Sequence, residues 1–301
     1  VSIGAGWYWV GKRQIGNENM RIERLGKTFV ARVHDLDLSQ PLDNETYAAL
    51  DEAWFENRVL AFPDQTLTEP QLMAISGHFG PLEKHVLENF HHNAYPEILM
   101  ISTVVEDDKP IGLADAGSYW HSDVSYKAEP SRASTLYGVE VPEAGGDTLF
   151  CDTAAAYDAL SDEMKTRLEG LKAAHNYDQR ELQASTKNIR GELTTAQKDQ
   201  TPEVLHPVVR TQPETGRRSI FVNPGFTVRI DGLAEDASTA LLGELFAHCL
   251  EDRFCYRYQW QKGDLLAWDN AVTMHRATVL DLAPGTRRTM WRTIISGDAP
   301  I

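Results

Sequence analysis

The segment Trp120-His121-Ser122-Asp123 contains two side chains that can bind a metal ion, spaced two residues apart. Residues at this spacing point to one face of an extended chain, so His121 and Asp123 predict two ligands of one site. The best candidate for a third ligand is His275, which comes just after a predicted strand at residues 265–268. Two histidines and one carboxylate leave open coordination positions, the pattern of non-haem Fe(II) oxygenases.

Two arginines near the end of the chain are candidates for binding an anion. Arg288 and Arg292 lie four residues apart on a predicted strand at 288–295, on the face that also carries Met290 and Ile294. A buried guanidinium needs an anionic partner, and its planar shape suits a carboxylate. A keto acid chelated by the metal would present its far carboxylate in this way. The alternative is that both arginines pair with acidic side chains of the protein itself.

Composition excludes several classes of protein. The 301 residues include 29 Lys+Arg and 44 Asp+Glu, a formal net charge of −15, which disfavours binding to nucleic acid. The 3 cysteines form no CxxC motif, so neither a disulfide scaffold nor a thiolate zinc site is expected. This use of cysteine suits a protein of the reducing cytoplasm. The chain shows neither an apolar run of about 18 residues for a membrane helix nor a secretory signal at its start.

Hydrophobic periodicity and turn residues predict a mainly β fold with appended helices. Strands are expected at 59–62, 134–141, 148–150, 265–268 and 288–295, with a further two-residue alternation over 254–260. Helices are expected at 45–56, 153–160, 162–170 and 236–250, and from a capping box at Thr68. Short strands joined by Gly/Pro turns favour a jelly-roll, cupin-like barrel.

The expected domain organisation is simple. Residues 1–19 show no clear period and are interpreted as an N-terminal arm or an expression remnant. Residues 20–301 are expected to form a single catalytic domain. Within it, the polar stretch 178–203 is interpreted as a long excursion or a lid.

Several separated motifs, in this order, give the chain a strong resemblance to a known family. The chain resembles the taurine dioxygenase / 2,4-dichlorophenoxyacetate dioxygenase group of Fe(II)- and 2-oxoglutarate-dependent enzymes from about Met20 to Ser296. The motifs are Phe79-Gly-Pro-Leu82, Trp120-His-Ser-Asp123, Gly145-Gly-Asp-Thr148, Leu205-His-Pro-Val208, Phe221-Val-Asn223, Trp268-Asp-Asn270 with His275, and Arg287-Arg288.

This resemblance implies a double-stranded β-helix and a set of residue roles. His121, Asp123 and His275 match the iron ligands. Arg288 matches the arginine that pairs with the distal carboxylate of 2-oxoglutarate, and Thr148 matches a hydroxyl that bonds the same cosubstrate. The implied reaction uses O2, converts 2-oxoglutarate to succinate and CO2, and hydroxylates the substrate. Related halogenases have Ala or Gly in place of the ligand aspartate, so Asp123 argues against halogenation.

The same resemblance suggests three substrate-binding residues without identifying the substrate. Arg292 matches a residue that grips the anionic group, His85 a second anion contact, and Phe226 an aromatic wall. A surface histidine and a core phenylalanine are the alternatives for the last two. Gly117 stands where a taurine enzyme has an asparagine, which disfavours taurine itself. The expected substrate is a small organic acid: a carboxylate, sulfonate, sulfate ester or aryloxyalkanoate. Hydroxylation beside a heteroatom would give an unstable product that falls apart.

Other functions remain as alternatives. A natural-product tailoring oxygenase of the same family is one. A cupin-like protein that binds a metal or small acid without turnover is another, although it need not keep all five of the metal and cosubstrate residues. A zinc hydrolase on the same triad gives no role to Arg288 or Thr148. The expected partner is a small anionic molecule, not a nucleic acid or a membrane, and the oligomeric state, a dimer or a tetramer by the resemblance, stays open.

Overall fold

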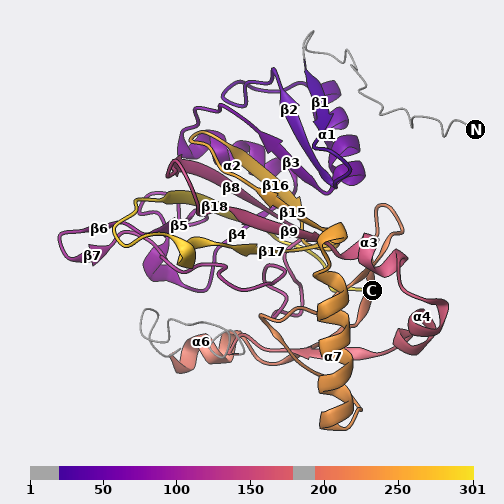
Figure 1. Ribbon diagram of the computed structural model, residues 1–301. Coiled ribbons are helices and arrows are strands. Elements are labelled where there is room, and N and C mark those ends of the chain that lie inside the picture. The colour runs from indigo at the N-terminus through magenta and orange to yellow at the C-terminus, as the bar shows by residue number, and fades with distance from the viewer. Residues whose placement is uncertain (1–19, 179–193) are drawn as a thin grey trace, which may run out of the picture.

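The computed structural model describes residues 20–178 and 194–301 (Figure 1). The strands are β1 (Arg21–Arg24), β2 (Val30–His34), β3 (Val59–Phe62), β4 (Leu82–Glu83), β5 (Leu99–Ser102), β6 (Val105–Glu106), β7 (Lys109–Pro110), β8 (Ala133–Glu140), β9 (Thr148–Asp152), β10 (Lys172–His175), β11 (Val204–Pro207), β12 (Val209–Thr211), β13 (Arg218–Ile220), β14 (Thr227–Ile230), β15 (Cys255–Tyr258), β16 (Leu265–Asp269), β17 (Thr273–Ala277) and β18 (Thr289–Ile295). The helices are α1 (Asn44–Asn57), α2 (Glu69–His78), α3 (Thr153–Asp158), α4 (Asp162–Leu168), α6 (Thr195–Gln200) and α7 (Glu235–Cys249), and short 3₁₀ turns are η1 (Glu88–Phe90), η2 (Asp252–Phe254) and η3 (Val279–Asp281).

Two antiparallel sheets form the jelly roll that the sequence predicts. The large sheet has the strand order β1-β2-β3-β16-β8-β18-β4, and β5 also pairs with β18. The small sheet has the order β15-β9-β17. Within the large sheet only β2 and β3 pair in parallel. Strands distant in sequence are therefore neighbours in space, which is how the fold gathers separated motifs.

The inner faces of the two sheets share one hydrophobic core. Strand β16 shows the alternation that this requires, because Leu266 and Trp268 face this core while Leu265 and Ala267 face the other side. On that other side, α1 and α2 cover the large sheet, with Trp54 only 1% exposed. In Figure 1 α1 lies beside β1 and β2, and α2 lies nearer to β8.

A further core cluster lies behind the small sheet. Cys151 of β9 and Met274 of β17 point away from the core between the two sheets and pack with Leu241 and Leu245 of α7. The helix spacing of four residues between these leucines is the one predicted from the sequence. Strands β9 and β17 therefore bury side chains on both faces of the small sheet.

Three predictions need correction or lie outside the described residues. The polar stretch 178–203 shows no clear period in sequence, and its described part contains the short helix α6, which the sequence did not predict. The rest of that stretch and the arm at 1–19 lie outside the described residues, so neither the lid nor the arm is tested. His275 was expected after a strand, whereas it lies inside β17, which the sequence did not predict.

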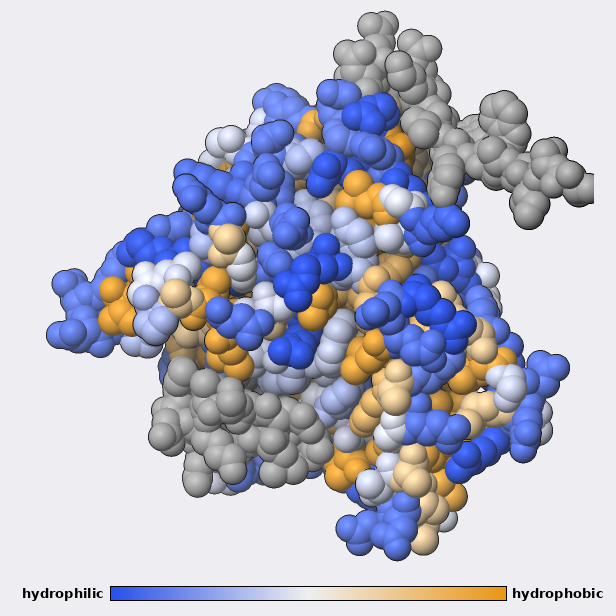
Figure 2. Space-filling view, viewed as in Figure 1, coloured by the Kyte–Doolittle hydropathy of each residue, from blue (hydrophilic) through white to orange (hydrophobic). Residues whose placement is uncertain are grey.

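Polar groups dominate the face of the molecule in Figure 2, with apolar residues in scattered groups. Within residues 20–178 and 194–301, no helix combines the length and the apolar character needed to cross a membrane.

A buried histidine makes the fold sensitive to acid. His175 of β10 is 0% exposed, contacts Ser125 Oγ through Nδ1 at 3.2 Å, and stacks on Phe221. Burial, with a smaller contribution from His206, lowers the pKa of His175 to about 3. In the unfolded chain the histidine has a pKa of about 6.5. Between about pH 6.5 and pH 3 the unfolded chain therefore binds a proton at this residue and the folded chain does not. The contribution of His175 to the free energy of unfolding is therefore constant above about pH 6.5 and decreases as the pH falls toward 3.

We expect the free energy of unfolding to fall by up to about 1.4 kcal/mol for each pH unit below about 6.5 because of this histidine. Denaturant unfolding of the wild type and of His175→Gln at pH 7.5 and pH 5 measures this. The variant is less stable at both pH values, but its stability should depend less on pH. Equal pH dependence in the two proteins would show that His175 is not the group responsible.

Candidate metal and cosubstrate site

Two segments far apart in sequence bring the candidate histidines side by side. The backbone N–H of His121 donates to the His275 carbonyl at 3.0 Å, and the N–H of His275 donates to the His121 carbonyl at 2.8 Å. This reciprocal pairing places the two imidazoles on one face, with ring centroids 4.2 Å apart. The register of one short bridge therefore fixes the relative positions of two ligands.

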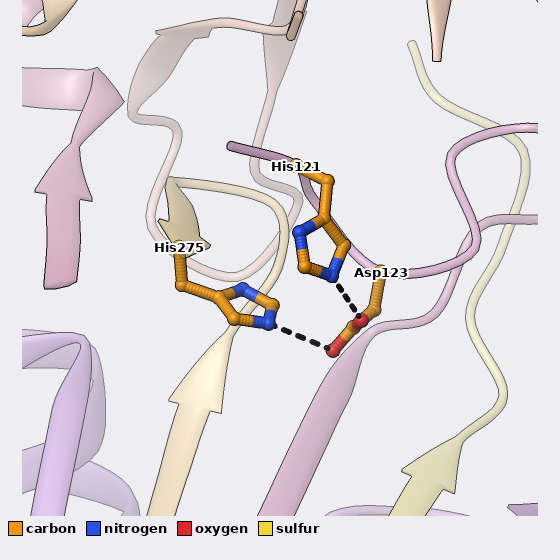
Figure 3. A group of neighbouring side chains, drawn as sticks. All are labelled: His121, Asp123 and His275. Carbon is orange, nitrogen blue, oxygen red and sulfur yellow. Dashed lines mark ion pairs between the residues drawn. The ribbon is translucent and has the colours of Figure 1, made fainter. Parts of the chain in front are cut away.

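Asp123 completes a compact group of donor atoms (Figure 3). Its Oδ1 lies 3.3 Å from His121 Nε2, and its Oδ2 lies 3.8 Å from His275 Nε2. One donor atom from each of the three buried residues lies within 4.8 Å of the others. Two imidazole nitrogens and one carboxylate oxygen fit a first-row divalent metal that keeps open positions for other ligands.

The tautomer of His121 favours Nε2 as the ligand atom. Its Nδ1 lies 2.8 Å from the Tyr119 carbonyl oxygen, which can only accept a hydrogen bond, so Nδ1 carries the proton. Gly117 lies against the same ring, and a Cβ there would come within 3.1 Å of His121 Cε1. Gly117 has a φ of 68°, a conformation that favours glycine. Both the backbone and the space beside the imidazole therefore require glycine at this position.

A polar network holds the Asp123 carboxylate in place. Ser134 Oγ of β8 donates to Asp123 Oδ2 at 2.6 Å. Asn270, directly after β16, accepts from the Asp123 backbone N–H at 3.2 Å and donates to Ser134 Oγ at 3.1 Å. Hydrogen bonds of this kind orient metal ligands and tune their basicity. The large sheet thus positions a ligand that it does not itself carry.

The charges of the group suit metal binding. Burial alone would raise the pKa of Asp123, but Arg292, His275 and His121 together hold it well below its usual range. Burial and the neighbouring His121 hold the pKa of His275 well below its usual range. At neutral pH the site therefore offers an ionised carboxylate and a neutral His275 imidazole, which are the forms that bind metals.

Arg288 and Thr148 lie near the start of β9 in the small sheet. Thr148 of β9 pairs with Ala277 of β17, two positions from the His275–Phe150 pair, so it shares the face of His275. Arg288 is 2% exposed, and its Nε donates to the Gly146 carbonyl at 3.2 Å. Its Nη2 is buried and has no hydrogen-bond partner among the described residues. A carboxylate oxygen of a bound ligand would satisfy that donor.

A pocket of about 380 Å³, part of it open to solvent, adjoins the metal ligands. His85, Phe226 and Arg292, which the sequence suggested as substrate-binding residues, all line it. Other residues that line the pocket were not predicted from the sequence; they include Tyr119, Tyr126, Tyr177, Leu99 and Leu113.

Arg292 has two roles in this geometry. It lines the pocket, and its Nη2 lies 2.5 Å from Asp123 Oδ1. The sequence offered substrate contact and pairing with a protein carboxylate as alternatives, and the structure shows the second while leaving the first open. Arg288, in contrast, forms no ion pair with an acidic side chain in the described part of the chain.

Removing the Ser134 hydroxyl should weaken metal binding. We expect Ser134→Ala to lower the affinity for a divalent metal by about 10- to 100-fold, because Asp123 loses the donor that orients it. Metal titration followed by a fluorescent competitor measures this. Ser76→Ala is a matched control, since Ser76 is equally buried and bonds Thr135 instead. The same metal affinity in both variants would show that Ser134 does not orient Asp123 for metal binding.

Comparisons with known proteins agree with the site. A model of the family described as "Taurine catabolism dioxygenase TauD, TfdA family" matches residues 21–294. The chain is 35% identical over 285 residues to an alpha-ketoglutarate-dependent 2,4-dichlorophenoxyacetate dioxygenase of Cupriavidus pinatubonensis, covering 91% of this chain and 96% of that protein. It is 34% identical to pentalenolactone F synthase of Streptomyces arenae, over 78% of this chain and 81% of that one.

Solved structures show the same fold. A taurine dioxygenase from Burkholderia xenovorans superposes with a TM-score of 0.77 at 31% identity, covering 94% of this chain and 91% of that chain. AAD-2, in complex with Mn(II) and N-oxalylglycine, superposes with a TM-score of 0.79 at 29% identity, covering 94% and 99%. With a family match over nearly its whole length and a compact His–Asp–His group at its centre, this chain belongs to the TauD, TfdA family and is an Fe(II)- and 2-oxoglutarate-dependent dioxygenase.

Proposed function

We propose that this enzyme binds Fe(II) through His121, Asp123 and His275 and hydroxylates a small anionic aromatic acid. The observation that carries the substrate class is the pocket beside the triad, which combines aromatic walls with two basic side chains. When bound, iron would supply activation of O2, coupled to decarboxylation of 2-oxoglutarate to succinate and CO2. The residues of the chain would bind, orient and enclose the reactants.

Arg288 is the proposed anchor of 2-oxoglutarate. Burial lowers its pKa to about 10, so the guanidinium still carries its charge at neutral pH. Its unpartnered Nη2 supports a contact with the distal carboxylate. The Thr148 hydroxyl accepts from Trp260 Nε1 at 2.9 Å, which leaves its own proton available for the same carboxylate.

The aromatic wall supports a ring-bearing substrate. The Phe226 ring stands edge-on to His121, with centroids 5.8 Å apart, and also contacts Tyr126 and Tyr177. Flat, rigid walls of this kind bind aromatic groups well. If the ring of the substrate lies against Phe226, the acidic side chain of the substrate would lie near the metal ligands.

Two nitrogen donors support an acidic substrate. Arg292 and His85 both line the pocket, and the only carboxylate among its described lining residues is Asp123, which pairs with Arg292. Such a pocket favours anions over amines. The proposed partner is accordingly a small anion, and the net charge of −15 argues against nucleic acid. We extend the proposal to a cytoplasmic location, which the three free thiols support.

Substrate-stimulated formation of succinate tests the substrate class. We expect an aryloxyalkanoate to stimulate succinate release, and its neutral methyl ester or an aliphatic sulfonate to do so far less. Stronger stimulation by taurine than by every aryl acid would contradict the aromatic assignment. Stimulation by none of these acids would favour the alternative of a natural-product tailoring role; one relative at 34% identity is a pentalenolactone F synthase.

Arg288→Ala should raise the KM for 2-oxoglutarate by about 10- to 100-fold, because hydrogen bonds to a charged group are lost. Metal affinity should stay close to that of the wild type. Arg287→Ala is the matched control, since the neighbouring Arg287 is exposed and pairs with Glu140. An unchanged KM in Arg288→Ala would mean that another residue holds the cosubstrate.

A further inference from the structure

Strands β9 and β15 place two cysteines directly opposite each other. Cys151 and Cys255 are partners in the register of this antiparallel pair, and the two strands lie side by side in Figure 1. Opposed residues on antiparallel strands have Cβ atoms about 4.5–5.5 Å apart. In a disulfide this distance is about 3.5–4.5 Å. A small approach of the strands therefore permits a bond between the two sulfur atoms.

The two sulfur atoms also face the same point. Cys151 Sγ lies 3.0 Å from the Cys249 carbonyl oxygen, and Cys255 Sγ lies 4.0 Å from it. Cys151 belongs to the core cluster under α7, and Cys255 packs against that cluster. Both side chains thus lie on the face of the small sheet that is opposite to Phe150 and His275, so the pair is separate from the candidate active site.

The two thiols differ in access and acidity. Cys151 is 0% exposed, whereas Cys255 is partly exposed. A hydrogen bond from Cys151 lowers the pKa of the Cys255 thiol, while burial raises the pKa of the Cys151 thiol. Cys255 is therefore suited to react first with a reagent in solution, and Cys151 to react with Cys255 afterwards.

We propose that Cys151 and Cys255 form a reversible disulfide between β9 and β15 when the protein meets a small-molecule disulfide such as oxidised glutathione. The Cys255 thiolate attacks one glutathione sulfur, the glutathione S–S bond breaks, and one glutathione leaves as a thiolate that takes up a proton. The Cys151 sulfur then attacks the Cys255 sulfur and displaces the second glutathione, whose departing thiolate takes up the proton of the Cys151 thiol. Two protein thiols are oxidised, and one glutathione disulfide is reduced to two thiols.

The link would stabilise the small sheet. It joins chain positions about a hundred residues apart, and a cross-link that closes so long a loop restricts the unfolded chain strongly. Strand β9 also pairs with β17, which carries His275, so the link lies one strand away from a metal ligand. We therefore expect a higher Tm in the oxidised form, restored to the original value by a reductant.

Thiol counting and peptide mapping of the full-length, iron-loaded protein test the proposal without O2. Oxidised glutathione should reduce the number of free thiols from three to one and yield a linked Cys151–Cys255 peptide, and dithiothreitol should reverse both. Cys151→Ala should instead keep one glutathione on Cys255. Cys249→Ala is the matched control and should still form the link, because the strand partner of Cys151 is Cys255 and not Cys249.

Three results on the wild type would each overturn the proposal, whatever the variants do. The free thiols persist, Cys255 keeps its glutathione, or the linked peptide contains Cys249. None of these results depends on metal binding or turnover, so they bear on the cysteine pair and leave the assignment of the active site untouched.

Discussion

The site depends on keeping one carboxylate charged where water is excluded. Asp123 is 1% exposed, and an isolated charge at such a position would be strongly unfavourable. Arg292 supplies the opposite charge, and Ser134 donates a hydrogen bond to the second oxygen. The neighbouring imidazoles complete the surroundings of the carboxylate. Removing any one of these partners would leave part of that charge uncompensated, so the metal ligands and their supports form a single unit.

The two sheets divide the work of building this unit. The small sheet carries His275 and Thr148, and the bridge to β17 positions His121. The large sheet supplies the groups that hold Asp123: Ser134 from β8, Arg292 from β18 and Asn270 after β16. The active site therefore lies where the sheets face each other, and its geometry is as rigid as the hydrophobic core between them.

The sequence predicts the elements well and their contacts poorly. Strong periodicity locates α1, α7, β3, β8 and β16, and the HxD spacing with His275 predicts the ligand group. Pairs such as Asn270 with Asp123, 147 residues apart, are set by strand register, which no local pattern encodes. The same limit explains why Tyr126 and Tyr177 were missed as pocket walls and why Cys151 and Cys255 gave no sign of being neighbours. Strand β17 was missed because its five residues begin only four positions after the end of another buried strand and give no separate period.

We propose that iron and Arg288 bind one 2-oxoglutarate together, and a binding measurement without O2 tests this most directly. Fe(II)-loaded protein is titrated with 2-oxoglutarate while visible absorption and the bound cosubstrate are followed. The wild type should develop a weak charge-transfer band that saturates at one 2-oxoglutarate per chain, and Asp123→Ala should develop none. Equal binding of 2-oxoglutarate with and without iron, or a full band in Asp123→Ala, would contradict the account.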